Sequence, residues 1–151
     1  MKSLKFLTAI LIITLFSCDK NRVFEKNTDF KLFEWEHDSE VVFNFKIEDE
    51  KPKNVLVNFR HTSVFLSRNV LLSLKITNPK NETEKIDINI PLSEPNGMWF
   101  GDCSGNICDI QFPINYTFID TGNYIFSFTQ NMRENPLSNI MSIGLRIENP
   151  E

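Results

Sequence analysis

Residues 41–47, Val-Val-Phe-Asn-Phe-Lys-Ile, alternate between two kinds of side chain. Val41, Phe43, Phe45 and Ile47 fall on one phase of a two-residue period, and Asn and Lys fall on the other. Such alternation predicts a β-strand with one buried face and one solvent-exposed face. The pattern returns in later segments, at residues 55–59, 70–76, 86–92, 124–128 and 141–147.

Turn-forming residues separate these segments, as at residues 78–81 (Asn-Pro-Lys-Asn) and 94–97 (Glu-Pro-Asn-Gly). Residues 107–112 and 115–119 predict two weaker strands, which brings the total to seven to nine, and no segment has the period of a helix. Pro91 cannot donate a hydrogen bond to a ladder, so its strand is predicted at a sheet edge. The chain is therefore predicted to be all-β, a single antiparallel β-sandwich.

A local motif refines this architecture. Asp120, Gly122 and Tyr124 have the spacing of the tyrosine corner of immunoglobulin-like sandwiches, in which the Tyr hydroxyl bonds to upstream backbone. Phe126 stands where an immunoglobulin domain has a Cys. The motif therefore predicts an immunoglobulin-like architecture and does not indicate kinship.

The N-terminus has the features of an export signal. Lys2 and Lys5 precede an apolar stretch at residues 6–16 that is too short to span a bilayer. Residues 15–18, Leu-Phe-Ser-Cys, resemble the lipobox of bacterial lipoproteins, in which the Cys receives a diacylglycerol and the chain is cleaved before it. This predicts a signal peptide at residues 1–17, a lipid-anchored tether that becomes an ordered lead-in at residues 18–36, and a sandwich at residues 37–151.

Under this interpretation Cys18 carries the lipid, including palmitate. The domain then belongs to the cell envelope and faces the periplasm, and the sequence does not distinguish an anchor in the inner membrane from one in the outer membrane. The alternative is ordinary cleavage nearby with Cys18 unmodified. Without Lys2 and Lys5 the exported chain keeps 14 basic and 20 acidic side chains, a net charge of −6. An acidic domain without a basic cluster argues against nucleic acid and against electrostatic docking on anionic lipid.

Cys103 and Cys108 flank a Ser-Gly-Asn turn sequence, and an oxidising compartment favours a disulfide between them. Free thiols remain an alternative. A metal site would need further ligands, and His37 and His61 lie far away in sequence with no ligand spacing between them. No metal or cofactor is therefore predicted.

No catalytic motif is present, so no catalytic residue is assigned and the chain is predicted not to be an enzyme. No small-molecule substrate is expected either. Glu94 and Asp102 flank Trp99 and could be nominated as an acid pair, but solvated loop carboxylates are the simpler interpretation. Trp35, Trp99 and Phe100 lie in loop-like sequence, which leaves two interpretations open. Their rings either bind a carbohydrate or cap the end of the sandwich by packing on its core.

Several segments together resemble the gliding-motility lipoproteins of the GldH family from Bacteroidetes. They are residues 17–24 (Ser-Cys-Asp-Lys-Asn-Arg-Val-Phe), 94–101 (Glu-Pro-Asn-Gly-Met-Trp-Phe-Gly), 130–135 (Gln-Asn-Met-Arg-Glu-Asn) and 143–148 (Ile-Gly-Leu-Arg-Ile-Glu). The resemblance implies a non-enzymatic component of the gliding machinery, which in this family works alongside type IX secretion. It also implies partners among the envelope proteins of that apparatus. Within the predicted partner loops, residues 95–109 and 132–139, the candidate contact residues are Trp99, Phe100 and Arg133.

Overall fold

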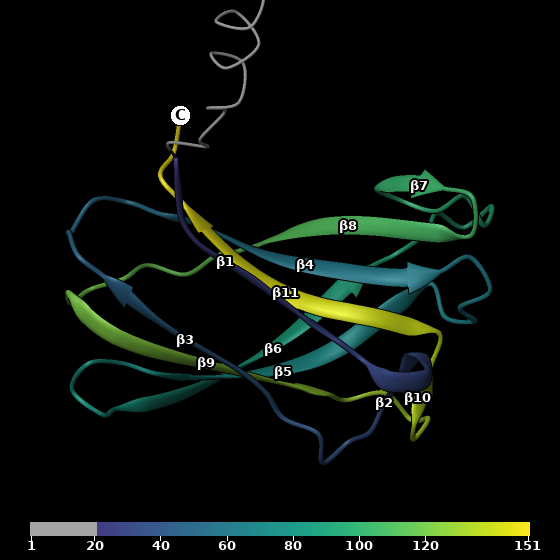
Figure 1. Ribbon diagram of the computed structural model, residues 1–151, viewed down its shortest axis with the longest axis horizontal. Coiled ribbons are helices and arrows are strands. Elements are labelled where there is room, and N and C mark those ends of the chain that lie inside the picture. Colours follow the sequence, from purple (N-terminus) through teal and green to yellow (C-terminus); the bar gives the residue numbers. More distant parts are fainter. Residues whose placement is uncertain (1–20) are drawn as a thin grey trace, which may run out of the picture.

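Two antiparallel sheets face each other in the computed structural model, which describes residues 21–151 (Figure 1). The five-stranded sheet has the spatial order β1 (Arg22–Asp29), β11 (Ile140–Glu148), β4 (Asn54–Thr62), β8 (Ile107–Ile114) and β7 (Asp102–Ser104). The four-stranded sheet has the order β3 (Val41–Ile47), β9 (Gly122–Gln130), β5 (Asn69–Thr77) and β6 (Thr83–Pro91). A short 3-10 turn, η1 (Lys31–Phe33), leads into a small two-stranded sheet of β2 (Glu34–Trp35) and β10 (Leu137–Ser138).

The predicted alternation sets the core. In β3 the side chains of Val41, Phe43, Phe45 and Ile47 are buried, and the residues between them are exposed. The inner positions of the other long strands are buried in the same cluster, so both sheets contribute to one apolar core. The predicted all-β sandwich is confirmed. Among residues 21–151, no helix is long and apolar enough to cross a bilayer.

Two local predictions are also confirmed. The Tyr124 hydroxyl donates to the Asp120 carbonyl at 3.0 Å and accepts from the Asp120 N–H at 3.3 Å, which forms the tyrosine corner. Strand β6, which ends at Pro91, lies at the edge of the four-stranded sheet.

The strand predicted at residues 115–119 is wrong. This segment crosses from β8 in one sheet to β9 in the other, so no neighbouring strand runs beside it. Tyr116 and Phe118 still point inward, with ring centroids 5.5 Å and 6.2 Å from that of Phe126. Their alternation therefore reflects closure of the sandwich edge and not a β-ladder.

The predicted boundary at residue 37 is also wrong, because the sandwich begins at Arg22. Strand β1 pairs with β11 along its whole length, from Arg22 opposite Glu148 to Asp29 opposite Ser142. β1 is an edge strand whose residues are exposed or half-buried, so its sequence lacks the alternation that marks a strand with one buried face. The predicted signal peptide and Cys18 lie outside the described residues.

The strands run between two ends of the sandwich, which we call proximal and distal. The proximal end holds residues 21–22, 48–53, 78–82, 115–121 and 149–151, and the distal end holds residues 30–33, 63–68, 92–107 and 131–139. The chain enters and leaves the domain at the proximal end, where the Asn149 N–H donates to the Asn21 carbonyl at 2.7 Å (Figure 1).

Two adjacent substitutions test whether β1 belongs to the domain. Phe24 packs with its ring centroid 5.2 Å from that of Phe45, whereas Val23 is exposed. Phe24→Ala should lower the free energy of unfolding by about 2 kcal/mol, the low end for a large-to-small change because Phe24 is half-buried. Val23→Ala should change it by under about 0.5 kcal/mol. Urea denaturation of the mature chain checks this, and equal effects would mean that β1 is a tether.

Candidate functional site

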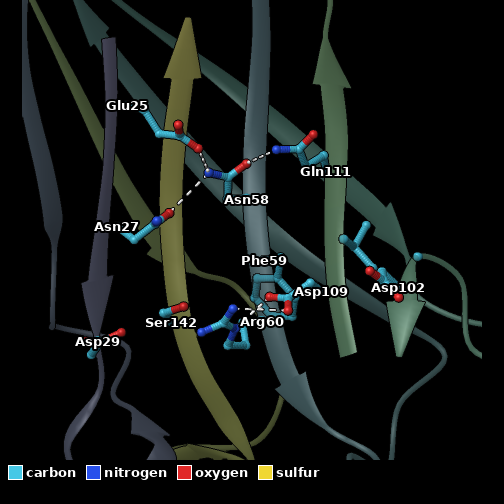
Figure 2. A pocket seen from close by; sticks show the side chains of 12 residues that line it. Glu25, Asn27, Asp29, Asn58, Phe59, Arg60, Asp102, Asp109, Gln111 and Ser142 are labelled. Carbon is cyan, nitrogen blue, oxygen red and sulfur yellow. Dashed lines mark hydrogen bonds and ion pairs between the residues drawn. The ribbon is translucent and has the colours of Figure 1, made fainter. Parts of the chain in front are cut away.

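A groove of about 660 Å³ lies on the outer face of the five-stranded sheet (Figure 2). Its floor is β11, whose outward residues here are Ser142 and Gly144. A Cβ at Gly144 would overlap the Asn27 side chain and lie 2.9 Å from the Lys26 carbonyl oxygen. The groove therefore forms because β11 carries small outward residues and its neighbours β1 and β4 carry longer ones.

One row of polar side chains crosses this groove from strand to strand. The Asn58 amide on β4 donates to Asn27 and to Glu25 on β1, each at 3.1 Å, and accepts from Gln111 on β8 at 3.1 Å (Figure 2). These side chains satisfy one another's hydrogen bonds. They make the outer face of the five-stranded sheet polar, whereas its inner face is apolar.

A second row crosses all five strands toward the distal end. In order across the sheet it consists of Asp29, Ser142, Arg60, Asp109 and Asp102, each opposite the next in register. The Arg60 guanidinium donates two hydrogen bonds to the Asp109 carboxylate, which raise the pKa of Arg60. Asp29 and Asp102 have no ion-pair partner among residues 21–151, so this row carries surplus negative charge.

Ser142 stands out in the second row. It is 7% exposed and lines the groove, and its hydroxyl makes no hydrogen bond with another described residue. The oxygen atom itself is not fully buried, so the hydroxyl is accessible from the groove. Ser142 therefore leaves a polar position open at the floor of the groove.

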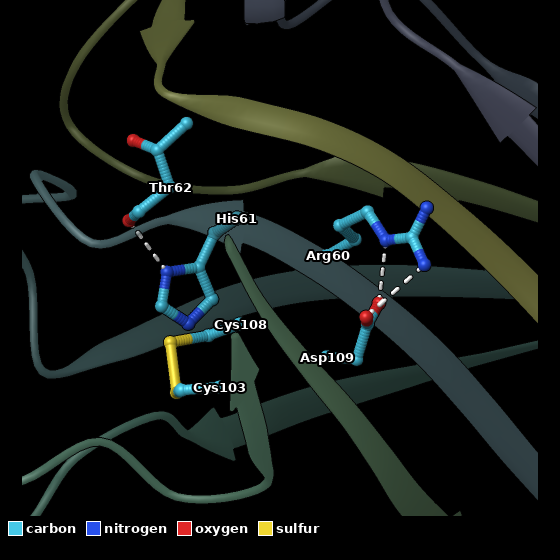
Figure 3. Close-up of a disulfide and its surroundings, with 6 residues drawn as sticks. All are labelled: Arg60, His61, Thr62, Cys103, Cys108 and Asp109. Carbon is cyan, nitrogen blue, oxygen red and sulfur yellow. Dashed lines mark hydrogen bonds and ion pairs between the residues drawn. A yellow bond between two sulfur atoms is a disulfide. The ribbon is translucent and has the colours of Figure 1, made fainter. Parts of the chain in front are cut away.

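The distal end is built around His61 and the two cysteines (Figure 3). Cys103 on β7 and Cys108 on β8 are joined by a disulfide across the hairpin turn, and Cys108 lies opposite His61 of β4. The His61 ring is fully buried, with ring centroids 4.6 Å from Trp99 and 5.7 Å from Phe65. In residues 21–151 no group of three or more His, Cys, Asp or Glu side chains is placed to hold a metal ion.

His61 is held neutral by its surroundings. Burial lowers the pKa of the imidazole, while the Thr62 carbonyl, 2.9 Å from Nδ1, opposes this. That contact places the proton on Nδ1, and Nε2 is buried without a hydrogen-bond partner among the described residues. A protonated ring would bury a charge with one N–H unpaired, which is unfavourable.

The residues that the sequence proposed as a partner surface lie in distal loops. Phe100 and Arg133 are exposed, whereas Trp99 is half-buried and makes an edge-type ring contact with His61. Trp35 is fully buried, its indole N–H donates to the Ser39 carbonyl, and its ring stacks on Phe30. The carbohydrate-binding alternative therefore loses Trp35 as a stacking surface.

The groove was not predicted from the sequence. Several of its residues sit on the polar phase of strands whose apolar phase was recognised, such as Asn58 and Arg60 on either side of Phe59, whereas others come from β1, which was not predicted. A pattern of Asn, Gln, Ser, Gly and Arg on outward positions was the available signal. Register alone shows that these positions meet, and register is not visible in a single strand.

Comparison with known proteins gives a consistent result. Residues 22–147 match the family described as GldH lipoprotein. A gliding motility lipoprotein GldH homolog from Christiangramia forsetii is 29% identical over 153 residues, which cover 95% of this chain and 93% of that protein. The gliding motility lipoprotein GldH of Flavobacterium johnsoniae is 28% identical over 144 residues, covering 90% of each chain.

Solved structures give only distant likenesses. A family GH115 4-O-methyl-α-glucuronidase aligns with 89% of this chain at a TM-score of 0.41 and 12% identity, and this chain spans 18% of its length. A family 35 carbohydrate binding module from Clostridium thermocellum aligns at a TM-score of 0.32 and 9% identity, over 80% of this chain and 97% of the module. Likenesses at this level carry no argument about function.

The buried imidazole predicts a pH dependence of stability. Because the folded-state pKa of His61 is lowered, the unfolded chain binds a proton first as pH falls. The stabilisation is thus complete above the unfolded pKa, near 6.5, and declines as pH drops below it. Denaturant titrations of the mature chain between pH 7.5 and pH 5 should show this decline. A His61→Phe variant should lose it, a His37→Gln variant should keep it, and an unchanged slope in His61→Phe would refute the assignment.

Proposed function

Because the chain belongs to the GldH lipoprotein family, we propose that it is a non-enzymatic, membrane-anchored component of the gliding machinery that acts by protein contact. The family match over residues 22–147 carries this proposal. The resemblance predicted from the sequence is confirmed by the match. The relatives in Christiangramia forsetii and Flavobacterium johnsoniae are gliding motility lipoproteins and align over nearly their whole length.

The proposed anchor is Cys18, in the segment Leu-Phe-Ser-Cys at residues 15–18. A lipid on this residue places the domain at the envelope, facing the periplasm. Two or more acyl chains hold a protein at a membrane firmly, whereas one chain holds it marginally. Anchoring confines the domain to a thin layer and so raises its effective concentration toward a membrane-bound partner.

A binding role fits the chemistry of the described surface. The polar groups of the groove are largely engaged with one another, as Asn58 and the Arg60–Asp109 pair illustrate. Such a face is a preformed, ordered surface for recognition. We extend the proposal to the link with type IX secretion that the family resemblance implies, with this chain as an accessory part.

A deletion strain tests the role in motility. Removal of the gene should abolish spreading on agar, and the wild-type gene should restore it. A Cys18→Ser variant should fail to incorporate labelled palmitate, should leave the membrane fraction and should fail to restore spreading. The matched control is the double variant Cys103→Ser, Cys108→Ser, which should still incorporate palmitate. Normal spreading of the deletion strain would rule out the motility role.

A further inference from the structure

The position of strand β1 determines how the domain can stand on a membrane. Only four residue steps separate Cys18 from Arg22, so the anchor reaches at most about 14 Å from the sheet. β1 then runs for eight residues, roughly 23 Å, toward the distal end. With a lipid on Cys18, the proximal end lies next to the bilayer and the distal end is directed away from it.

Exposed apolar side chains gather at the distal end. Among residues 21–151, twelve large apolar side chains are exposed, and seven of them are distal: Leu32, Phe33, Val64, Leu66, Met98, Phe100 and Ile107. Ile119 is the counterpart in a proximal loop, and the other four lie on strands. Single exposed apolar residues are ordinary, but a group of them marks an interaction surface.

The loops at residues 63–68, 92–107 and 131–139 form one connected surface. The Ser63 N–H donates to the Asn106 carbonyl at 2.9 Å, and the Leu92 N–H donates to the Arg68 carbonyl at 2.8 Å. The Thr62 N–H donates to the Asn139 carbonyl at 3.0 Å, which ties the same region to β10. The backbone therefore holds the apolar side chains in fixed relative positions.

The η1 turn adds an independent sign of function. Leu32 and Phe33 have φ angles of 57° and 56°, a left-handed conformation that costs energy for residues other than glycine. Leu32 is 87% exposed, so burial of its side chain does not offset this cost. A strained backbone that exposes an apolar side chain to solvent is expected where another molecule covers that side chain.

Charge decides the kind of partner. Asp29 and Asp102, at opposite edges of the five-stranded sheet, carry the unpaired carboxylates of the second row. Four strand spacings of about 4.8 Å put them roughly 19 Å apart, beside the distal loops. The exported chain has a net charge of −6, which repels anionic lipids and anionic glycans. Three cations, Lys31, Arg68 and Arg133, also lie at the distal end, but the carboxylates there outnumber them: Asp29, Glu34, Glu36, Asp38, Glu40, Glu94, Asp102 and Glu134. This excess of negative charge complements a basic protein surface.

We propose that the distal end docks onto a protein whose contacting face carries apolar side chains and Lys or Arg residues. The inference rests on the proposed function, because the anchor at Cys18 sets the orientation. The apolar loops bury against the partner, and Asp29 and Asp102 pair with its basic side chains. Ser142 offers the partner a hydrogen bond at the floor of the groove.

Photocrosslinking in living cells tests the docking surface. A benzoylphenylalanine is placed at Leu66, at Met98 or at Ile119 in the full-length protein, in a strain without the native copy. The distal positions should crosslink to one protein, and mass spectrometry should map the adducts to a basic, apolar face. Ile119, 81% exposed at the proximal end, is the matched control and should not crosslink to that protein.

Charge reversal makes the test specific. The double variant Asp29→Lys, Asp102→Lys should reduce the crosslink yield at Leu66 at least fivefold. The same change of charge at the proximal end, Glu50→Lys with Glu151→Lys, should leave the yield within twofold. Unchanged circular dichroism and thermal unfolding establish that each variant is folded. The milder variant Leu66→Ser, probed with benzoylphenylalanine at Met98, gives a second readout and should also lower the yield.

The outcomes separate this inference from the proposed function. Crosslinks to lipid or glycan, equal crosslinks from Ile119, or a yield indifferent to charge at Asp29 and Asp102 would overturn the docking surface, even if the deletion strain fails to spread. Normal spreading of the deletion strain would overturn the motility role, even if the distal end binds a protein.

Discussion

Strand β11 must satisfy opposite demands on its two faces. Ile143, Leu145 and Ile147 are fully buried on its inner side, where they complete the core. Its outer side carries Ser142 and Gly144, which let the side chains of β1 and β4 meet across it. Its two edges pair with β1 and β4 along nearly their whole lengths. The core, the groove and the attachment of the first strand therefore all depend on this one segment.

The sequence predicted the parts of the fold that depend on a single strand and its neighbours in the chain. Alternation in β3 identified its buried face, and the Asp120–Tyr124 spacing identified the tyrosine corner. It failed where tertiary position overrides local pattern. β1 is an edge strand whose partner lies more than a hundred residues away, so nothing local marks it. The groove arises from the register among β1, β11, β4 and β8. His61 is buried because distal loops that are distant in sequence pack over its ring.

The two ends of the sandwich differ in chemistry as well as in position. The described chain enters and leaves the domain at the proximal end, and charged pairs such as Lys53–Asp49 and Lys80–Asp120 lie there. The distal end gathers the disulfide, a buried neutral imidazole and exposed apolar loops. The hairpin closed by Cys103 and Cys108 braces this end, because it lies against His61, which packs Trp99 and Phe65. A domain with this polarity is suited to join a membrane to something beyond it.

The antiparallel pairing of β1 with β11 also has a mechanical consequence. In a chain attached through Cys18 and held at its distal loops, tension runs along β1 toward its N-terminus. Ladder hydrogen bonds lie perpendicular to the strands, so this pull shears the β1–β11 ladder instead of unzipping it. The bonds from Arg22 to Asp29 then bear the load together, not one after another. With the proposed lipid on Cys18, a single edge strand would thus make the link between lipid and domain resistant to force.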